Sequence, residues 1–149
     1  QLHIGLFIAV IALQGIGKVQ VALGVLGKTG EWTDSDKRLV RRHVVDGYRV
    51  LRGRFDFSGA IMLWHHRFQA QGYPKRLPRP LVQFSDTSKL LIRDHGRVLA
   101  MADVYDALHR QNDKHGTLSE REIKIKMMEY NPDLRLYISA LYDYEVLKL

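Results

Sequence analysis

Apolar residues recur at helical spacing along most of the chain, whereas the alternation typical of strands is almost absent. The clearest pattern runs from about 33 to 52 and predicts one helix. Thr33 followed by Asp36 resembles a capping box in which the shorter aspartate replaces glutamate. Only Lys18–Leu23 alternates as a short strand would. The pattern therefore predicts an all-helical fold.

Helices of the same kind are expected elsewhere along the chain. They are predicted over about 4–13, 58–68, 86–95, 97–110, 119–129 and 133–147. Gly96 is expected to separate two of them, because glycine weakens a helix interior. Turns are expected through the glycine-rich stretch 15–30, and a loop over 69–85, which holds three of the four prolines. We find no internal repeat and expect one domain over 1–149.

Composition and charge narrow the classes of function. The chain has 149 residues, of which 46% are hydrophobic and 26% charged, as in globular proteins. The absence of cysteine excludes disulfide scaffolds, zinc–thiolate sites, iron–sulfur clusters and cysteine nucleophiles. The net charge of +7 favours anionic partners. The apolar run 4–13 is shorter than the roughly 20 residues that span a bilayer, so we expect no membrane span and a cytoplasmic location.

Four polar residues stand inside apolar helical stretches. They are His43, His65, His66 and Asp103. A single such histidine is usually a hydrogen-bonded core residue, but three imidazoles and an acid in three predicted helices favour a metal site. A His/Asp donor set without thiolate suits manganese or iron, with zinc also open. Asp106 shares a face with Asp103, and a merely local capping or pairing role stays open for it.

The order of several motifs resembles the HD-GYP family, a branch of the HD-domain metal phosphohydrolases. His43-x-x-x-Gly47, the pair His65-His66, Gly72-Tyr73-Pro74 and the stretch Arg97–Leu108 match its pattern in sequence. The resemblance runs from about residue 8 to the last helix. It implies an HD-domain-like helical bundle, and family members hydrolyse cyclic di-GMP with a di- or tri-metal centre.

The resemblance also implies roles for particular residues. By position, the metal ligands would be His43, His65, His66 and Asp103. Lys18 matches the lysine that faces the substrate phosphate, and Tyr73 is the tyrosine of the GYP motif. Arg110 and Lys114 lie near the segment where the family has a phosphate-binding R-P-Y-R or R-P-Y-K, but out of register. Gly47 is expected to be a close-packing position.

The chain departs from the family pattern at positions that belong to the metal centre of the family. Gln14 and Gly15 stand where the family has its His-Asp pair, and Arg67 replaces the acid after the paired histidines. The domain is also expected to lack the family's first helices. Because Gly15 offers no carboxylate, the resemblance implies either no metal or one weakly bound divalent ion, manganese or iron.

Two functional hypotheses follow. The first is a degenerate member, a pseudoenzyme of bacterial signalling that binds cyclic di-GMP or docks a protein with an acidic surface, without a catalytic residue. The alternative is an active metal-dependent cyclic di-GMP phosphodiesterase with an atypical metal site. Nucleic acid is not expected as a partner, because only net charge supports it. The basic residues at 37–38 and 41–42 are expected on a solvated helix face, with a docking patch as the alternative.

Overall fold

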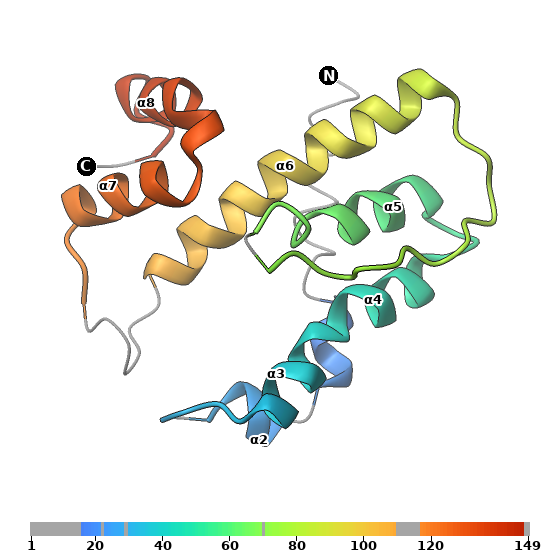
Figure 1. Cartoon of the computed structure of the whole chain (residues 1–149). Helices are drawn as coiled ribbons and strands as arrows, with labels where there is room; N and C mark the ends of the chain where they lie inside the picture. Colours follow the sequence, from blue (N-terminus) through green and yellow to red (C-terminus); the bar gives the residue numbers. More distant parts are fainter. Residues whose placement is uncertain (1–15, 22, 29, 70, 110–116, 148–149) are drawn as a thin grey trace. The chain divides into compact units, whose positions relative to one another are not determined.

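Every regular element in the described part of the protein is helical (Figure 1). The computed structural model describes residues 16–21, 23–28, 30–69, 71–109 and 117–147. The predicted all-helical fold is thereby confirmed, while the helix predicted over 4–13 lies outside these ranges. The chain divides into two compact units, Gln1–Ala100 and Met101–Leu149, which are described separately. A single domain over the whole chain stays a prediction.

The first unit contains five complete helical elements and the beginning of a sixth. They are η1 (Ile16–Gln20), α2 (Leu23–Leu26), α3 (Asp34–Arg41), α4 (His43–Leu51), α5 (Asp56–Trp64) and α6 (Asp86–His109). The predicted loop over 69–85 is confirmed, because this stretch lies between α5 and α6.

The helix predicted over 33–52 is instead two helices. The Arg42 N–H donates to the Leu39 oxygen at 3.2 Å, and this tighter turn makes His43 the first residue of α4.

The prediction of two helices around Gly96 is wrong, because α6 continues through that residue. A Cβ at Gly96 would lie 2.6 Å from the Cβ of Trp64. The glycine is therefore a close-packing position that lets α6 approach α5, and this packing outweighs its low helix propensity. Around this contact Ile61, Ile92 and Leu99 form a buried cluster.

Alanine at Gly96 is expected to destabilise the first unit by about 1–3 kcal/mol, because the backbone of α6 must move away from Trp64. The matched control is Gly24→Ala, where an added Cβ meets nothing within 4 Å. Urea denaturation should separate the two variants. Equal midpoints would show that α6 and α5 do not pack closely at Gly96.

The short strand suggested by alternation at Lys18–Leu23 is wrong, since η1 and the start of α2 occupy this stretch.

Gly17 and Gly47 allow η1, α4 and α5 to pack very closely. Gly17, predicted to break the chain, lies inside η1, where a Cβ would sit 1.8 Å from the His43 carbonyl oxygen. A Cβ at Gly47 would lie 2.5 Å from the Met62 Cε, so its predicted close-packing role is confirmed. These contacts hold η1 and α5 against α4.

The second unit contains the end of α6, α7 (Glu120–Tyr130), η2 (Pro132–Leu134) and α8 (Arg135–Asp143). The capping box predicted at Ser119 and Glu122 is confirmed at the start of α7. The capping box predicted at Thr33 and Asp36, at the start of α3 in the first unit, is also confirmed. The last helix ends near 143, earlier than predicted, because Glu145 adopts a left-handed φ of 57°. Within the described residues, no helix combines the length and the apolar character needed to cross a bilayer.

Candidate metal and ligand site

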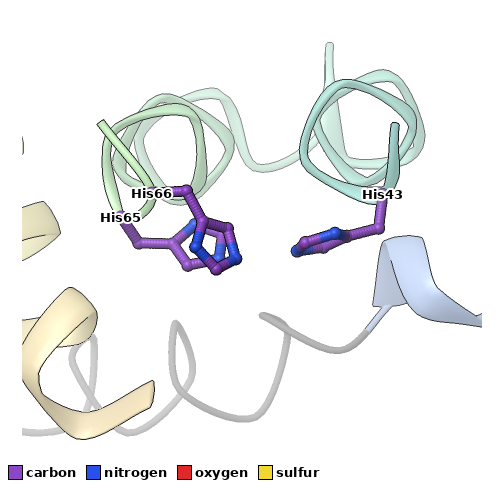
Figure 2. A group of neighbouring side chains, drawn as sticks. All are labelled: His43, His65 and His66. Carbon is purple, nitrogen blue, oxygen red and sulfur yellow. The ribbon is translucent and has the colours of Figure 1, made fainter. Parts of the chain in front are cut away.

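Three of the four predicted metal ligands lie together in the first unit. His43 begins α4, and His65 and His66 directly follow α5. All three side chains are buried. Their ring centroids are 5.6 Å apart for His43 and His65, 5.1 Å for His43 and His66, and 4.0 Å for His65 and His66. Figure 2 shows the rings pointing toward one another from the two helical segments.

Backbone carbonyls fix the tautomer of two of these histidines. His43 Nδ1 lies 2.6 Å from the Val40 oxygen, and His65 Nδ1 contacts the Met62 oxygen. A carbonyl oxygen only accepts, so each Nδ1 carries a proton and a metal would have to bind through Nε2. Histidine ligands in proteins usually donate their other ring N–H in this way.

The third histidine has a different partner. His66 Nδ1 lies 2.9 Å from Gln69 Nε2, and an amide nitrogen can only donate a hydrogen bond. In this arrangement Nδ1 accepts, and the proton of the neutral ring sits on Nε2. Burial lowers the pKa of His66 to about 2, and the neighbouring His65, His43 and Lys18 lower this pKa further. The ring is therefore neutral at physiological pH, as a metal ligand must be.

The spacing of the three rings suits a single divalent ion. One ligand nitrogen from each ring lies within 4.8 Å of the others. Metal–nitrogen bonds of about 2.0–2.1 Å place tetrahedral ligand nitrogens about 3.4 Å apart, so small side-chain movements would close the site. All three ligand residues of this group belong to the first unit. Three imidazoles fit one ion and provide no bridge to a second.

The tyrosine of the GYP motif packs directly on the histidines. The Tyr73 ring stacks on His66, with centroids 4.5 Å apart and planes at 18°, and meets His43 edge-on at 6.4 Å. Its backbone N–H donates to the His66 oxygen at 3.3 Å. At Gly72 a Cβ would lie 2.4 Å from the Arg67 oxygen, so only glycine permits this tight return of the chain. The turn places an aromatic ring against the site.

Arg41, which is predicted from the sequence to lie on a solvated helix face, lies beside this tyrosine. The Arg41 guanidinium carbon is 5.5 Å from the Tyr73 ring centroid, and its Nη2 donates to Gln71 Oε1 at 3.0 Å. Neighbouring Arg42 instead pairs with Asp46 at 3.7 Å. No sequence signal distinguishes the two arginines, because only the folded turn at 71–73 brings Tyr73 to Arg41.

The remaining predicted site residues have different positions. Lys18 is half-buried in η1, close enough for its charge to act on His66. Asp103 is buried in the second unit, and its convergence with His43 and His65 stays a prediction. Four further positions, Gln14, Gly15, Arg110 and Lys114, lie outside the described residues.

Comparison with known proteins identifies relatives, although no family model matches the chain. The chain is 34% identical over 101 residues to the cyclic di-GMP phosphodiesterase response regulator RpfG of Xanthomonas campestris, covering 64% of this chain and 24% of that protein. It is 31% identical over 143 residues to a cyclic di-GMP phosphodiesterase of Pseudomonas aeruginosa, covering 90% of this chain and 32% of the relative. A 3'3'-cGAMP-specific phosphodiesterase of Vibrio cholerae is 26% identical over 121 residues, with 78% and 21% covered.

The chain thus spans between a fifth and a third of the length of these relatives. The first two share one activity in their names, and the third acts on a related cyclic dinucleotide. Together with the buried histidines beside a GYP tyrosine, these identities of 26–34% make the chain a distant homologue of the HD-GYP cyclic di-GMP and 3'3'-cGAMP phosphodiesterases.

Proposed function

We propose that this chain binds cyclic di-GMP without hydrolysing it, and holds at most one divalent metal ion at His43, His65 and His66. The observation that carries the proposal is the buried group of three imidazoles in the first unit, combined with Gly15 at the position where the family pattern has its central aspartate. Homology to cyclic-dinucleotide phosphodiesterases supports the class of ligand.

Hydrolysis of a phosphodiester needs an activated water and neutralisation of charge on the phosphoryl oxygens. A bound divalent ion supplies both by lowering the pKa of its water and by acting as a Lewis acid. Two-metal sites clamp both the attacking and the leaving oxygen, and the ions are held by shared ligands. Gly15 replaces the central aspartate of the family pattern, and Gln14 offers only an amide. The proposal is therefore binding without turnover.

Binding needs fewer groups than hydrolysis. Tyr73 presents an aromatic ring at the histidines, and aromatic stacking contributes roughly 1–3 kcal/mol per base in nucleotide complexes. Lys18 adds a positive charge near His66, which suits a phosphate. The proposed ligand residues thus combine a stacking surface with a cation. Arg110 and Lys114 are proposed as further phosphate-binding residues, and Asp103 as a fourth ligand of the single ion, as the resemblance implies.

An active phosphodiesterase with an atypical metal site is the second candidate. The three histidine nitrogens within 4.8 Å favour it, because they can hold one ion. Relatives of 31–34% identity that are named phosphodiesterases also favour it. A docking module for an acidic protein is the outcome that remains if no dinucleotide binds.

The test follows binding and turnover in one preparation. Purified protein is incubated with cyclic di-GMP and excess Mn²⁺ or Fe²⁺, with affinity measured by calorimetry and linear product by chromatography. We expect saturable binding, no steady turnover, and binding weakened about tenfold or more by Tyr73→Ala, as loss of base stacking predicts. Tyr130→Ala, an exposed tyrosine of the second unit, is the control. Steady turnover that disappears in His65→Ala would establish the active enzyme instead.

A further inference from the structure

A small polar pocket lies beside the turn that carries Tyr73. Its volume is about 230 Å³, and it is lined by Arg67, Gln69, Gly72, Pro74 and Lys75. All five residues belong to the first unit. No metal ligand lines this pocket, although Gln69 contacts His66 on one side of it.

The lining carries two positive charges and no acid. Neither Arg67 nor Lys75 forms an ion pair with any described residue. Elsewhere in the described chain, cations such as Lys28, Arg49 and Lys89 pair with nearby aspartates. Two unneutralised cations that share one pocket repel each other, and an anion between them removes this cost.

Arg67 is held in place before any ligand arrives. Its guanidinium carbon lies 5.0 Å from the Trp64 ring centroid, and its Nη1 donates to the Pro74 oxygen at 2.9 Å. A guanidinium has five N–H donors in a rigid fork, so donors remain for a ligand. Gly72 keeps the turn tight against the Arg67 backbone, where a Cβ would lie 2.4 Å from the Arg67 oxygen.

We propose that this pocket binds a phosphate group between Arg67 and Lys75, with the Gln69 amide as a further hydrogen-bond donor. Phosphate matches the forked donors of arginine, and lysine adds a point charge. Arg67 stands where the HD-GYP pattern has an acid, so the charge at this position is reversed. The proposal needs no metal and does not rest on the function proposed above. Free phosphate and a phosphate of a nucleotide offer the same chemistry.

Trp64 provides a reporter for the test. The chain has two tryptophans, and Trp32→Phe leaves only Trp64, which packs on Arg67. Inorganic phosphate is titrated into this variant, with chloride at matched ionic strength as the control. We expect a saturable change in Trp64 fluorescence with phosphate alone. A response equal to that of chloride would overturn the proposal.

Affinities across charge variants are measured by calorimetry with inorganic phosphate. Arg67→Gln is expected to weaken binding at least tenfold and Lys75→Gln severalfold, as loss of charge-assisted hydrogen bonds predicts. Arg76→Gln removes the next cation, which does not line the pocket, and should change nothing. Lys75 is exposed, so its variant tests the site even where Arg67→Gln disturbs the fold. Equal affinities for Lys75→Gln and Arg76→Gln would also overturn the proposal.

Two further arms separate this site from the histidine site and identify the source of the phosphate. Phosphate affinity should be unchanged in His65→Ala and after chelation, whatever the fate of metal binding. Cyclic di-GMP is then added at saturating phosphate. Displacement supports a site for a nucleotide phosphate, and simultaneous binding supports a site for free phosphate. Loss of phosphate binding in His65→Ala would contradict a site independent of the histidines.

Discussion

Gly17→Ala is expected to destabilise the first unit by about 3 kcal/mol or more, at the upper end of overpacking effects. The added Cβ would lie 1.8 Å from the His43 carbonyl oxygen and 2.8 Å from the Gly47 backbone nitrogen. Both neighbours are backbone atoms of α4, so no side chain can rotate to make room. Either η1 leaves α4 or the first turn of α4 opens.

Either movement reaches the proposed site. Lys18 follows Gly17 in η1, and His43 supplies the oxygen that the new methyl group would strike. We therefore expect weaker divalent-metal binding together with the lower stability. Urea denaturation and metal titration check both results, with Gly24→Ala as the same substitution in open space. A Gly17→Ala protein as stable as Gly24→Ala would show that η1 does not pack on α4 in this way.

Gln69→Glu is expected to raise the affinity for one divalent ion by roughly 10- to 100-fold, the range that outer-shell partners of metal ligands control. The Gln69 amide nitrogen lies 2.9 Å from His66 Nδ1, which places the ring proton on Nε2. A carboxylate can only accept, so it would move the proton to Nδ1. His66 would then match His43 and His65, whose Nδ1 atoms face carbonyl oxygens.

Calorimetry with Mn²⁺ and Zn²⁺ at pH 7.5 measures this effect, and ¹⁵N spectra of the imidazole rings report the tautomer directly. Gln71→Glu adds the same charge two residues away, beside Arg41 rather than His66. It should change metal affinity much less. If both variants raise the metal affinity equally, then the added negative charge alone explains the effect, and the hydrogen bond to His66 has no particular role.

Helix ends were the less predictable part of the fold. The capping boxes at Thr33 and Ser119 are local, because their side-chain bonds join residues three apart, and the sequence predicts them correctly. The split between α3 and α4 at Arg42 leaves the apolar periodicity on both sides intact, so the pattern alone predicts a single helix. The end of α8 depends on the backbone conformation of Glu145, which its residue type does not predict.

Three features follow from the sequence alone: the helical class, the two capped helix starts and, through motif order, the trio His43, His65 and His66. Periodicity, capping and motif spacing are properties of neighbours along the chain, so they can be read without a fold. The roles of Gly17 and Gly96 depend on the folded structure, because a glycine that breaks a helix and one that admits a neighbouring segment look alike in sequence. The fold also brings Arg67 and Lys75 to the lining of one pocket, since charges from different parts of a loop meet only when the backbone brings them together.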